Sequence, residues 1–417
     1  MHITIIAMGS RGDVTSYAVL GGALRRAGHT LLLATMASFA SLAERYDLDF
    51  FLLPGDAEAL VQTAGAQGGL AGGRSIPRLW KAITKSYGAL AQAWAERFSA
   101  NELLETDLYI NQLPGGLFGW DLAEKSGRLM LAATVIPLAF TRSMPVMGFP
   151  ALPLPGYNAL SYRLAEQLVW SFFGPVVNRW RQHKLGLPPH PPGGYFTAMQ
   201  HWTPVLNGFS PLVVPPPPDW GAQVHTLGYW LPEQADWQPP LELLRFLEAG
   251  PAPVFIGFGS MPVPDPPQTT ALVLEALRRT GQRGVVHSGW AGLAADSLPD
   301  TVFKVDYAPY DWLFPRMRMI IHHGGSGTTA FGLRSGVPSM VVSFAYDQPF
   351  WGRRIAALGA GPAPIPFNRL TVENLAAAID RTVQDTAMHH QAAWVAAELR
   401  QEDGLGSAVR LIEELKI

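Results

Sequence analysis

The sequence contains no cysteine among its 417 residues. Disulfides, thiolate nucleophiles and cysteine-ligated zinc or iron–sulfur sites are therefore excluded, while the redox compartment stays open. Charge is also scarce, because only 15% of the residues are charged and 31 Lys and Arg nearly balance 33 Asp and Glu. A chain without a basic excess gives no reason to expect a nucleic-acid partner. Nothing in it requires an obligate protein partner either.

Long hydrophobic runs are missing as well. The best apolar stretch, residues 129–140, is about half as long as the roughly 20 residues that a membrane-spanning helix needs. The first residues have no basic lead and no small-residue cleavage site, so we expect a cytoplasmic protein. By contrast, 13 Trp, 20 Phe and 36 Pro supply much rigid apolar surface. Such surface suits an apolar ligand or peripheral contact with a membrane.

The length and the hydrophobic pattern predict two domains, since a single core stops growing near roughly 250 to 300 residues. Short apolar strands alternate with helical segments in both halves, which predicts an α/β fold of two doubly wound, Rossmann-like domains facing across a cleft. The predicted strands are residues 3–8, 31–34, 108–111 and 128–136, then 254–257, 284–287, 319–322 and 339–343.

The domain boundaries follow from composition. The stiff run of prolines at 215–218 predicts a connector. We therefore expect an N-terminal domain over residues 1–214, a linker over 215–240, a C-terminal domain over 241–395, and a final helix over 396–417 that packs back on the N-terminal domain.

The stretch HHGGSGTT at 322–329 is the most informative motif. It follows a predicted strand and opens a helix that ends at Gly336. Unobstructed amides at a helix start bind phosphate, and hydroxyl and imidazole groups add donors. A plain tight turn is the alternative. The predicted diphosphate-binding residues are His322, Gly324, Gly325, Ser326, Gly327 and Thr328, with Ser260 added from a second glycine turn at 257–260.

Three further positions are candidates. Asp13 follows the first strand and is either a general base or an ordinary helix N-cap, and the local sequence leaves both open. Asp347 and Gln348 follow the last central strand and suit the vicinal hydroxyls of a hexose, although turn chemistry alone explains the aspartate. Tyr307 could stack on a nucleoside base or simply pack in its loop.

Several other patterns carry little weight. The DxD spacing of residues 47–49 leads into a strand, which favours a solvated strand entry over a metal site. The first turn lacks the GxGxxG fingerprint of dinucleotide binding. The chain also has no GxSxG nucleophile elbow, which argues against a serine hydrolase.

Over most of its length the chain resembles the sterol glucosyltransferase branch of the nucleotide-sugar glycosyltransferases, which have the two-domain B-type fold. The resemblance is carried by GSRGDV at 9–14, RRAGHTLLLAT at 25–35, VNRWR at 177–181, GYW at 228–230, FIGFGSM at 255–261, YDWLFPR at 310–316, HHGGSGTT at 322–329 and DQPFWGRR at 347–354.

The resemblance implies an inverting hexosyltransferase with UDP-glucose as the default donor. It implies that the HHGG stretch grips the donor diphosphate, that Asp347 and Gln348 hold the sugar, and that Asp13 is the base. It calls for no cofactor and no metal, and dTDP-deoxysugars are alternative donors. The first domain binds the acceptor in this family, and the loops at 55–87 and 141–162 are apolar enough for a sterol, a carotenoid, a polyketide or a hydroxy fatty acid.

Two departures from the family pattern bear on the site. Thr15 and the next two residues follow GSRGDV where relatives usually have a residue and then proline. Asn111 and Gln112 stand near the fourth strand, where relatives with a histidine base have a second aspartate. Two other functions remain open from the residues, namely a nucleotide-sugar epimerase or hydrolase and an inactive relative that carries an apolar ligand. Transient membrane contact to reach a lipid acceptor is a further expectation.

Overall fold

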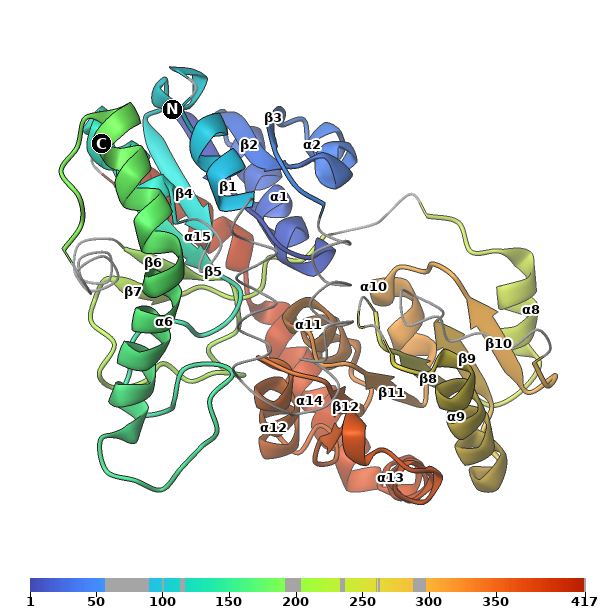
Figure 1. Cartoon of the computed structure of the whole chain (residues 1–417). Coiled ribbons are helices and arrows are strands. Elements are labelled where there is room, and N and C mark those ends of the chain that lie inside the picture. Colours follow the sequence, from blue (N-terminus) through green and yellow to red (C-terminus); the bar gives the residue numbers. More distant parts are fainter. Residues whose placement is uncertain are drawn as a thin grey trace. The chain divides into compact units, whose positions relative to one another are not determined.

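The structure, a computed structural model, describes residues 1–56, 90–99, 101–112, 117–191, 204–232, 237–259, 261, 263–287 and 298–415. The chain folds into two units (Figure 1). The first contains the described residues up to Pro232 and those from Asp403 onward, and the second contains the described residues between Trp237 and Glu402. Each unit is built on a parallel sheet with connecting helices. This confirms the predicted α/β class.

The first unit contains a seven-stranded sheet in the order β3-β2-β1-β4-β5-β6-β7, with every pair parallel. The inner strands are buried along nearly their whole length, which is why they read as continuous apolar runs. The strand order reverses between β1 and β4, and open α/β sheets bind ligands at such a switch point. The strands are β1 His2–Ile6, β2 Thr30–Met36, β3 Asp49–Leu53, β4 Leu108–Gln112, β5 Leu129–Thr134, β6 Val205–Asn207 and β7 Val224–Thr226.

The helices of the first unit connect these strands. They are α1 Arg11–Arg26, η1 Ala37–Phe39, α2 Ala40–Arg45, η2 Asn101–Leu104, α5 Gly119–Ser126, α6 Tyr157–Trp180 with the π-helical turn η3 Arg181–Leu185, and α15 Gly404–Glu414. The last helix, α15, packs on α1 within this unit (Figure 1). Its first residue must be small, since a Cβ on Gly404 would lie 2.7 Å from the carbonyl oxygen of Tyr229.

The second unit contains a six-stranded parallel sheet in the order β10-β9-β8-β11-β12-β13, with its switch point between β8 and β11. The strands are β8 Val254–Gly257, β9 Gly284–His287, β10 Val302–Val305, β11 Met319–His322, β12 Ser339–Ser343 and β13 Ile365–Pro366. The helices are α8 Leu241–Glu248, α9 Pro266–Thr280, α10 Tyr310–Leu313, η4 Phe314–Arg316, α11 Ser326–Ser335, α12 Gln348–Ala357, η5 Phe367–Arg369, α13 Val372–Gln384 and α14 Thr386–Gln401.

The chain changes units at two places that differ from the expected boundaries. The four prolines at 215–218 join β6 to β7, and both strands belong to the first sheet, so the first unit extends to Pro232. Near the other end, α14 belongs wholly to the second unit and the return follows Glu402. A proline run cannot donate ladder hydrogen bonds, and here it serves as a crossover between two parallel strands. In the described parts of the chain, no helix combines the length and apolar character that crossing a bilayer requires.

Candidate functional site

The turn after β1 holds Asp13 at the switch point of the first sheet. Ser10 is the N-cap of α1, so the helix begins earlier than predicted and Asp13 occupies its third position. The backbone amide and the hydroxyl of Ser10 both donate to Asp13 Oδ2, each at 2.8 Å. The turn needs glycine, because Gly9 has φ +136° and a Cβ there would lie 2.7 Å from the same oxygen. Asp13 is therefore not the N-cap.

The surroundings of Asp13 change its acidity. Its carboxylate is partly buried, and burial raises its pKa although the two Ser10 hydrogen bonds oppose that shift. Tyr17 lies one turn further along α1, fully buried, and its hydroxyl donates to the carbonyl of Ala133 at 2.9 Å. Burial and then the charge of Asp13 raise the pKa of Tyr17, so the phenol stays protonated. A raised carboxyl pKa at a strand end is typical of a general base.

Gln112 supports this turn from β4. Its Oε1 accepts a hydrogen bond from the amide of Met8, which is the residue that leads from β1 into the turn. Asn111 and Gln112 are both buried. An amide at this place orders the turn without adding negative charge.

The turn after β11 leads into α11 at the switch point of the second sheet. Gly324 has φ +91°, and a Cβ there would lie 2.5 Å from Val341 Cγ1, so this position requires glycine. Gly325 is the N-cap and α11 ends before Gly336, which has φ +79°, as predicted. The helical hydrogen bonds begin with the Thr329 amide, which donates to Gly325 at 2.9 Å.

The first turn of α11 can therefore face an anion. The amides of Ser326, Gly327 and Thr328 precede the first helical hydrogen bond, and the helix start carries no acidic residue. A Cβ on Gly327 would meet nothing within 4 Å. Amides at a helix start, combined with the positive end of the helix dipole, bind phosphate groups well.

Two histidines brace the turn before α11. His322 is fully buried, and its Nδ1 accepts from the Gly324 amide at 3.1 Å. His323 lies against both glycine turns: a Cβ on Gly259 would be 2.9 Å from its Cε1, and one on Gly325 would be 2.5 Å from its Nε2. Burial lowers the pKa of His322 to about 3 and that of His323 to about 4. Both rings are neutral, and the one predicted as a phosphate donor, His322, orders the turn from beneath.

His287 lies beside these two histidines, although no sequence motif singles it out. It ends β9 and is paired in register with Gly257, which is itself paired with His322. Burial lowers its pKa, while a hydrogen bond with the backbone of Asp306 opposes the shift. A histidine at a strand end has no local motif, and only the register of three strands brings it to the site.

Asp347 and Gln348 begin α12 after β12. The indole of Trp351 donates to Asp347 Oδ2 at 2.8 Å, which orients the carboxylate. Gln348 is buried, and its Oε1 accepts from the amides of Phe344 and Ala345 at 2.7 and 3.2 Å. The preceding residue, Tyr346, has φ +59°, an unusual conformation for a side chain of this size.

The other predicted donor-site residues lie as follows. Tyr307 is 46% exposed in the loop after β10, two residues from the end of that strand. Ser260 lies outside the described residues. Gln348 Nε2 is 3.1 Å from Sδ of Met261, so the loop after β12 contacts the chain beside Ser260. Of the predicted acceptor loops, residues 57–87 also lie outside the described residues.

The chain is 36% identical over 98% of its length to sterol 3-beta-glucosyltransferase UGT80B1 of Arabidopsis thaliana, and it covers 67% of that protein. The chain belongs to the sterol 3-beta-glucosyltransferase family. It is also 34% identical to UGT80A2 of the same plant, covering 65% of it, and 32% identical to the enzyme of Aspergillus clavatus, covering 29% of it. The chain thus spans about two thirds of the plant relatives and under a third of the fungal one.

Other comparisons agree with this membership. Residues 272–412 match the family model of the erythromycin biosynthesis protein CIII-like C-terminal domain. The fold is similar to that of the kitacinnamycin glycotransferase (TM-score 0.74, 20% identity, 99% of this chain and 98% of that chain). It is also similar to SsfS6 of Streptomyces sp. SF2575 complexed with thymidine diphosphate (TM-score 0.65, 21% identity, both chains fully covered). The protein is a nucleotide-sugar glycosyltransferase with the B-type fold, as the sequence predicts.

The family motif VNRWR ends in a buried ion-pair cluster. Arg181 donates to Asp121 Oδ1 and, at 2.9 Å, to Glu124 Oε2, while His190 Nε2 lies 2.6 Å from Asp121 Oδ1. Burial raises the pKa of Asp121, and His190 and Arg181 oppose that shift. The acids and the histidine resemble a metal-ligand set, but the guanidinium already lies among their oxygens. The cluster therefore ties α5 to the end of α6.

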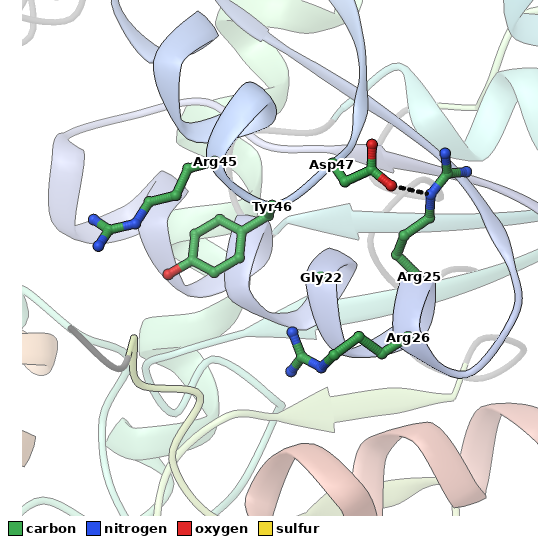
Figure 2. Close-up of a pocket in the computed structure, with 6 residues that line it drawn as sticks. All are labelled: Gly22, Arg25, Arg26, Arg45, Tyr46 and Asp47. Carbon is green, nitrogen blue, oxygen red and sulfur yellow. Dashed lines mark hydrogen bonds and ion pairs between the residues drawn. The ribbon is translucent and has the colours of Figure 1, made fainter. Parts of the chain in front are cut away.

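A surface cavity of about 360 Å³ lies at the far end of α1 (Figure 2). Two arginines from the last turn of α1 and one from α2 border it, and Arg25 donates to Asp47 Oδ2 at 3.0 Å. Cations at helix C-termini offset the helix dipole, which accounts for these arginines. The cavity is separated from Asp13 by most of the helix, or about 20 Å at 1.5 Å per residue. Its lining residues are Gly22, Arg25, Arg26, Arg45, Tyr46 and Asp47.

Proposed function

We propose that this glycosyltransferase moves a hexose from a nucleotide diphosphate sugar, with UDP-glucose as the default, to a hydroxyl of an apolar acceptor, and that it inverts the anomeric carbon. The relatives named sterol 3-beta-glucosyltransferase support a sterol or a similar lipid as the acceptor. A natural product of polyketide type is the alternative, and two structural neighbours are named as the glycotransferase of kitacinnamycin and the calicheamicin glycosyltransferase. We expect the protein to be cytoplasmic and peripheral to membranes.

The start of α11 is the observation that carries the proposal. Its helix-start amides receive the diphosphate, together with the hydroxyls of Ser326 and Thr328, while His322 and His323 hold the turn in shape. Donors that are already in position then stabilise the charge that develops on the leaving diphosphate. In many enzymes such electrostatic stabilisation makes the largest single contribution to the rate enhancement. Asp347, oriented by Trp351, accepts hydrogen bonds from the hydroxyls of the sugar.

Three other residues complete the proposed donor site. Gln348 positions Asp347, because its side chain closes the loop between β12 and α12. Tyr307 is exposed enough to stack on the nucleoside base. Ser260 adds a hydroxyl donor from the turn after β8.

Asp13 is the proposed general base. Its carboxylate takes the proton from the acceptor hydroxyl as that oxygen forms a bond to the anomeric carbon. The bond between this carbon and the diphosphate oxygen breaks, and the nucleoside diphosphate leaves with the electron pair. A single displacement of this kind inverts the anomeric centre and needs no covalent intermediate. The amides of α11 offset the leaving charge, so we propose that the reaction needs neither a metal nor a cofactor.

A mass-spectrometric screen tests the proposal. The purified protein is incubated with UDP-glucose, UDP-galactose and dTDP-sugars against sterols, polyketides and hydroxy lipids, with and without EDTA. We expect one acceptor class to gain the mass of one hexose, with an equal rate in EDTA. Donor breakdown or an altered sugar without transfer would instead support a hydrolase or an epimerase. If EDTA abolishes transfer and a divalent cation restores it, the proposal that the reaction needs no metal is wrong.

A further inference from the structure

Helix α6 is apolar on two faces. One face is buried and carries Tyr162, Trp170 and Trp180. On the other, Leu160, Leu164 and Leu168 are 51%, 45% and 39% exposed. A spacing of four residues places these three leucines in one row along the helix. A helix that is apolar all round is normally buried, so the exposed row indicates a surface that something else covers.

The loop before α6 continues this apolar row. Leu152 and Leu154 are 43% and 60% exposed. The loop is held by hydrogen bonds, because Asn158 Nδ2 donates to the carbonyl of Arg142 at 2.9 Å and the amide of Tyr157 donates to that of Leu154 at 3.1 Å. Among the described residues, five of the twelve exposed large hydrophobic side chains lie between positions 152 and 168. We call these five leucines the α6 leucine face.

Within the segment that carries the α6 leucine face the exposed charges are positive, and one exposed acid from another segment, Asp219, lies beside Arg142 and offsets its charge. Between positions 142 and 187 the exposed charged residues are Arg142, Arg163, Arg179 and Lys184. The single acid of this stretch, Glu166, is half-buried. This excess is local, because the whole chain has a formal net charge of −2. Exposed apolar side chains in a segment that also carries exposed cations match the surface of an anionic bilayer, which is apolar below its negatively charged headgroups.

We propose that the α6 leucine face docks on the surface of an anionic lipid bilayer. The leucines enter the boundary between headgroups and acyl chains, and the four cations meet the headgroups. A second copy of this chain fits less well, since an isologous contact would bring like charges together. The inference rests on the proposed function, because contact with a bilayer would bring the enzyme to an acceptor that is dissolved in the membrane.

Vesicle co-sedimentation of the full chain, without donor or acceptor, tests the apolar part. The vesicles are phosphatidylcholine with or without phosphatidylglycerol. The double variant Leu164→Ser, Leu168→Ser should lower the partition coefficient for the anionic vesicles about tenfold, because it removes apolar area that enters the bilayer. The control, Leu241→Ser with Trp394→Ser, changes side chains of similar exposure, 60% and 49%, in the second unit. It should bind like the wild type.

Charge variants test the electrostatic part. Arg163→Gln with Arg179→Gln should lower binding to the anionic vesicles about fivefold for each charge at low salt, since each cation near such a surface contributes about 1 kcal/mol. Arg26→Gln with Arg45→Gln removes the same charge at the cavity of Figure 2 and should have little effect. A larger effect of the control pair would overturn the assignment of the surface.

Two readouts separate this inference from the proposed function. The leucine variant should transfer sugar to a water-soluble acceptor at the wild-type rate and unfold at the wild-type temperature. If the wild type binds vesicles but transfers no sugar, the proposed function fails and the docking surface stands. If light scattering shows a wild-type dimer that the leucine variant converts to a monomer, the face contacts a second copy and the bilayer proposal is wrong.

Discussion

The two units use the same device, a glycine turn that leads from a central strand into a helix, with opposite chemistry. In the first unit the third helical residue is Asp13, and burial raises its pKa. In the second unit the helix start has no acid, and burial keeps His322 and His323 neutral. This contrast supports the proposed roles, in which the first turn accepts a proton and the second holds an anion. The fold positions each turn at the switch point of its sheet, and a few side chains determine the chemistry of that turn.

Glycine also serves different ends in the two turns. Gly9 leaves room for the carboxylate of Asp13, and Gly325 leaves room for the ring of His323. Gly327 is different, because a Cβ there would meet nothing within 4 Å. A residue that neither packing nor backbone conformation requires to be glycine points to the approach of a ligand.

The largest expected effect is the loss of activity when the proposed base in the first turn is removed. Asp13→Asn keeps the shape and the acceptor for both Ser10 hydrogen bonds but removes the base, so kcat should fall about 10² to 10⁴-fold. Donor affinity, measured by calorimetry, should stay within about twofold. Because the folded state holds the Asp13 proton more tightly than the unfolded state, ionising Asp13 at neutral pH costs stability. The Asn variant should therefore unfold at the same temperature as the wild type or above it.

The matched control is Asp47→Asn. Asp47 pairs with Arg25 instead of a serine, and its side chain is 82% exposed at the far end of α1. We expect no change in kcat. An unchanged rate in the Asp13 variant would remove this residue from the mechanism.

A pair of glycine variants separates folding from donor binding in the second turn. Gly324→Ala forces a Cβ against Val341 at a left-handed φ, so it should lower the free energy of unfolding by about 2 to 4 kcal/mol. Gly327→Ala should stabilise the fold by up to about 1 kcal/mol, yet raise the donor KM about tenfold, because the methyl group obstructs the amides. Thermal unfolding and steady-state kinetics measure both. A Gly327 variant with wild-type KM would argue against diphosphate binding at this helix start.

Much of the fold could be predicted because its signals are local. Runs such as VFIG and MIIH are buried on both sides, and β8 and β11 have the predicted bounds. The sequence left an N-cap at Asp13 open, whereas the cap is Ser10, because Arg11 and Gly12 carry no apolar pattern that marks the earlier helix start. The positions of β6 and β7 on either side of a proline run depend on pairing with distant strands, which no local pattern shows.

The site was predicted by position better than by role. The motif at 322–329 predicts the helix start, but the sequence cannot say that His322 is buried and accepts from the Gly324 amide. Gln348 shows the same limit, since its partners are amides whose positions depend on the loop. His287 reaches the cluster only through register. Side-chain direction and strand register are long-range properties, and a motif read along the chain does not contain them.

A further expected effect is a difference between the two units in the pH dependence of stability. His322 and His323 have folded pKa values of about 3 and about 4, below the ordinary value of 6.5. Their contribution to stability is therefore complete above about pH 6.5 and is lost as the pH falls toward 4. At pH 5 this amounts to up to about 2 kcal/mol for each histidine. The raised pKa of Asp13 acts in the other direction, since its proton is held more tightly in the folded state.

Hydrogen exchange can resolve this difference, because it follows peptides of the two units separately where one melting curve cannot. Between pH 7 and pH 5, after correction for intrinsic exchange rates, protection in β11 and α11 should fall, while protection in β1 and α1 should hold. His322→Gln with His323→Gln replaces both rings by groups that do not titrate, and should remove most of the pH dependence in the second unit. If the slope survives in that variant, other groups destabilise the second unit in acid, and the electrostatic contrast between the two turns is not what separates their stabilities.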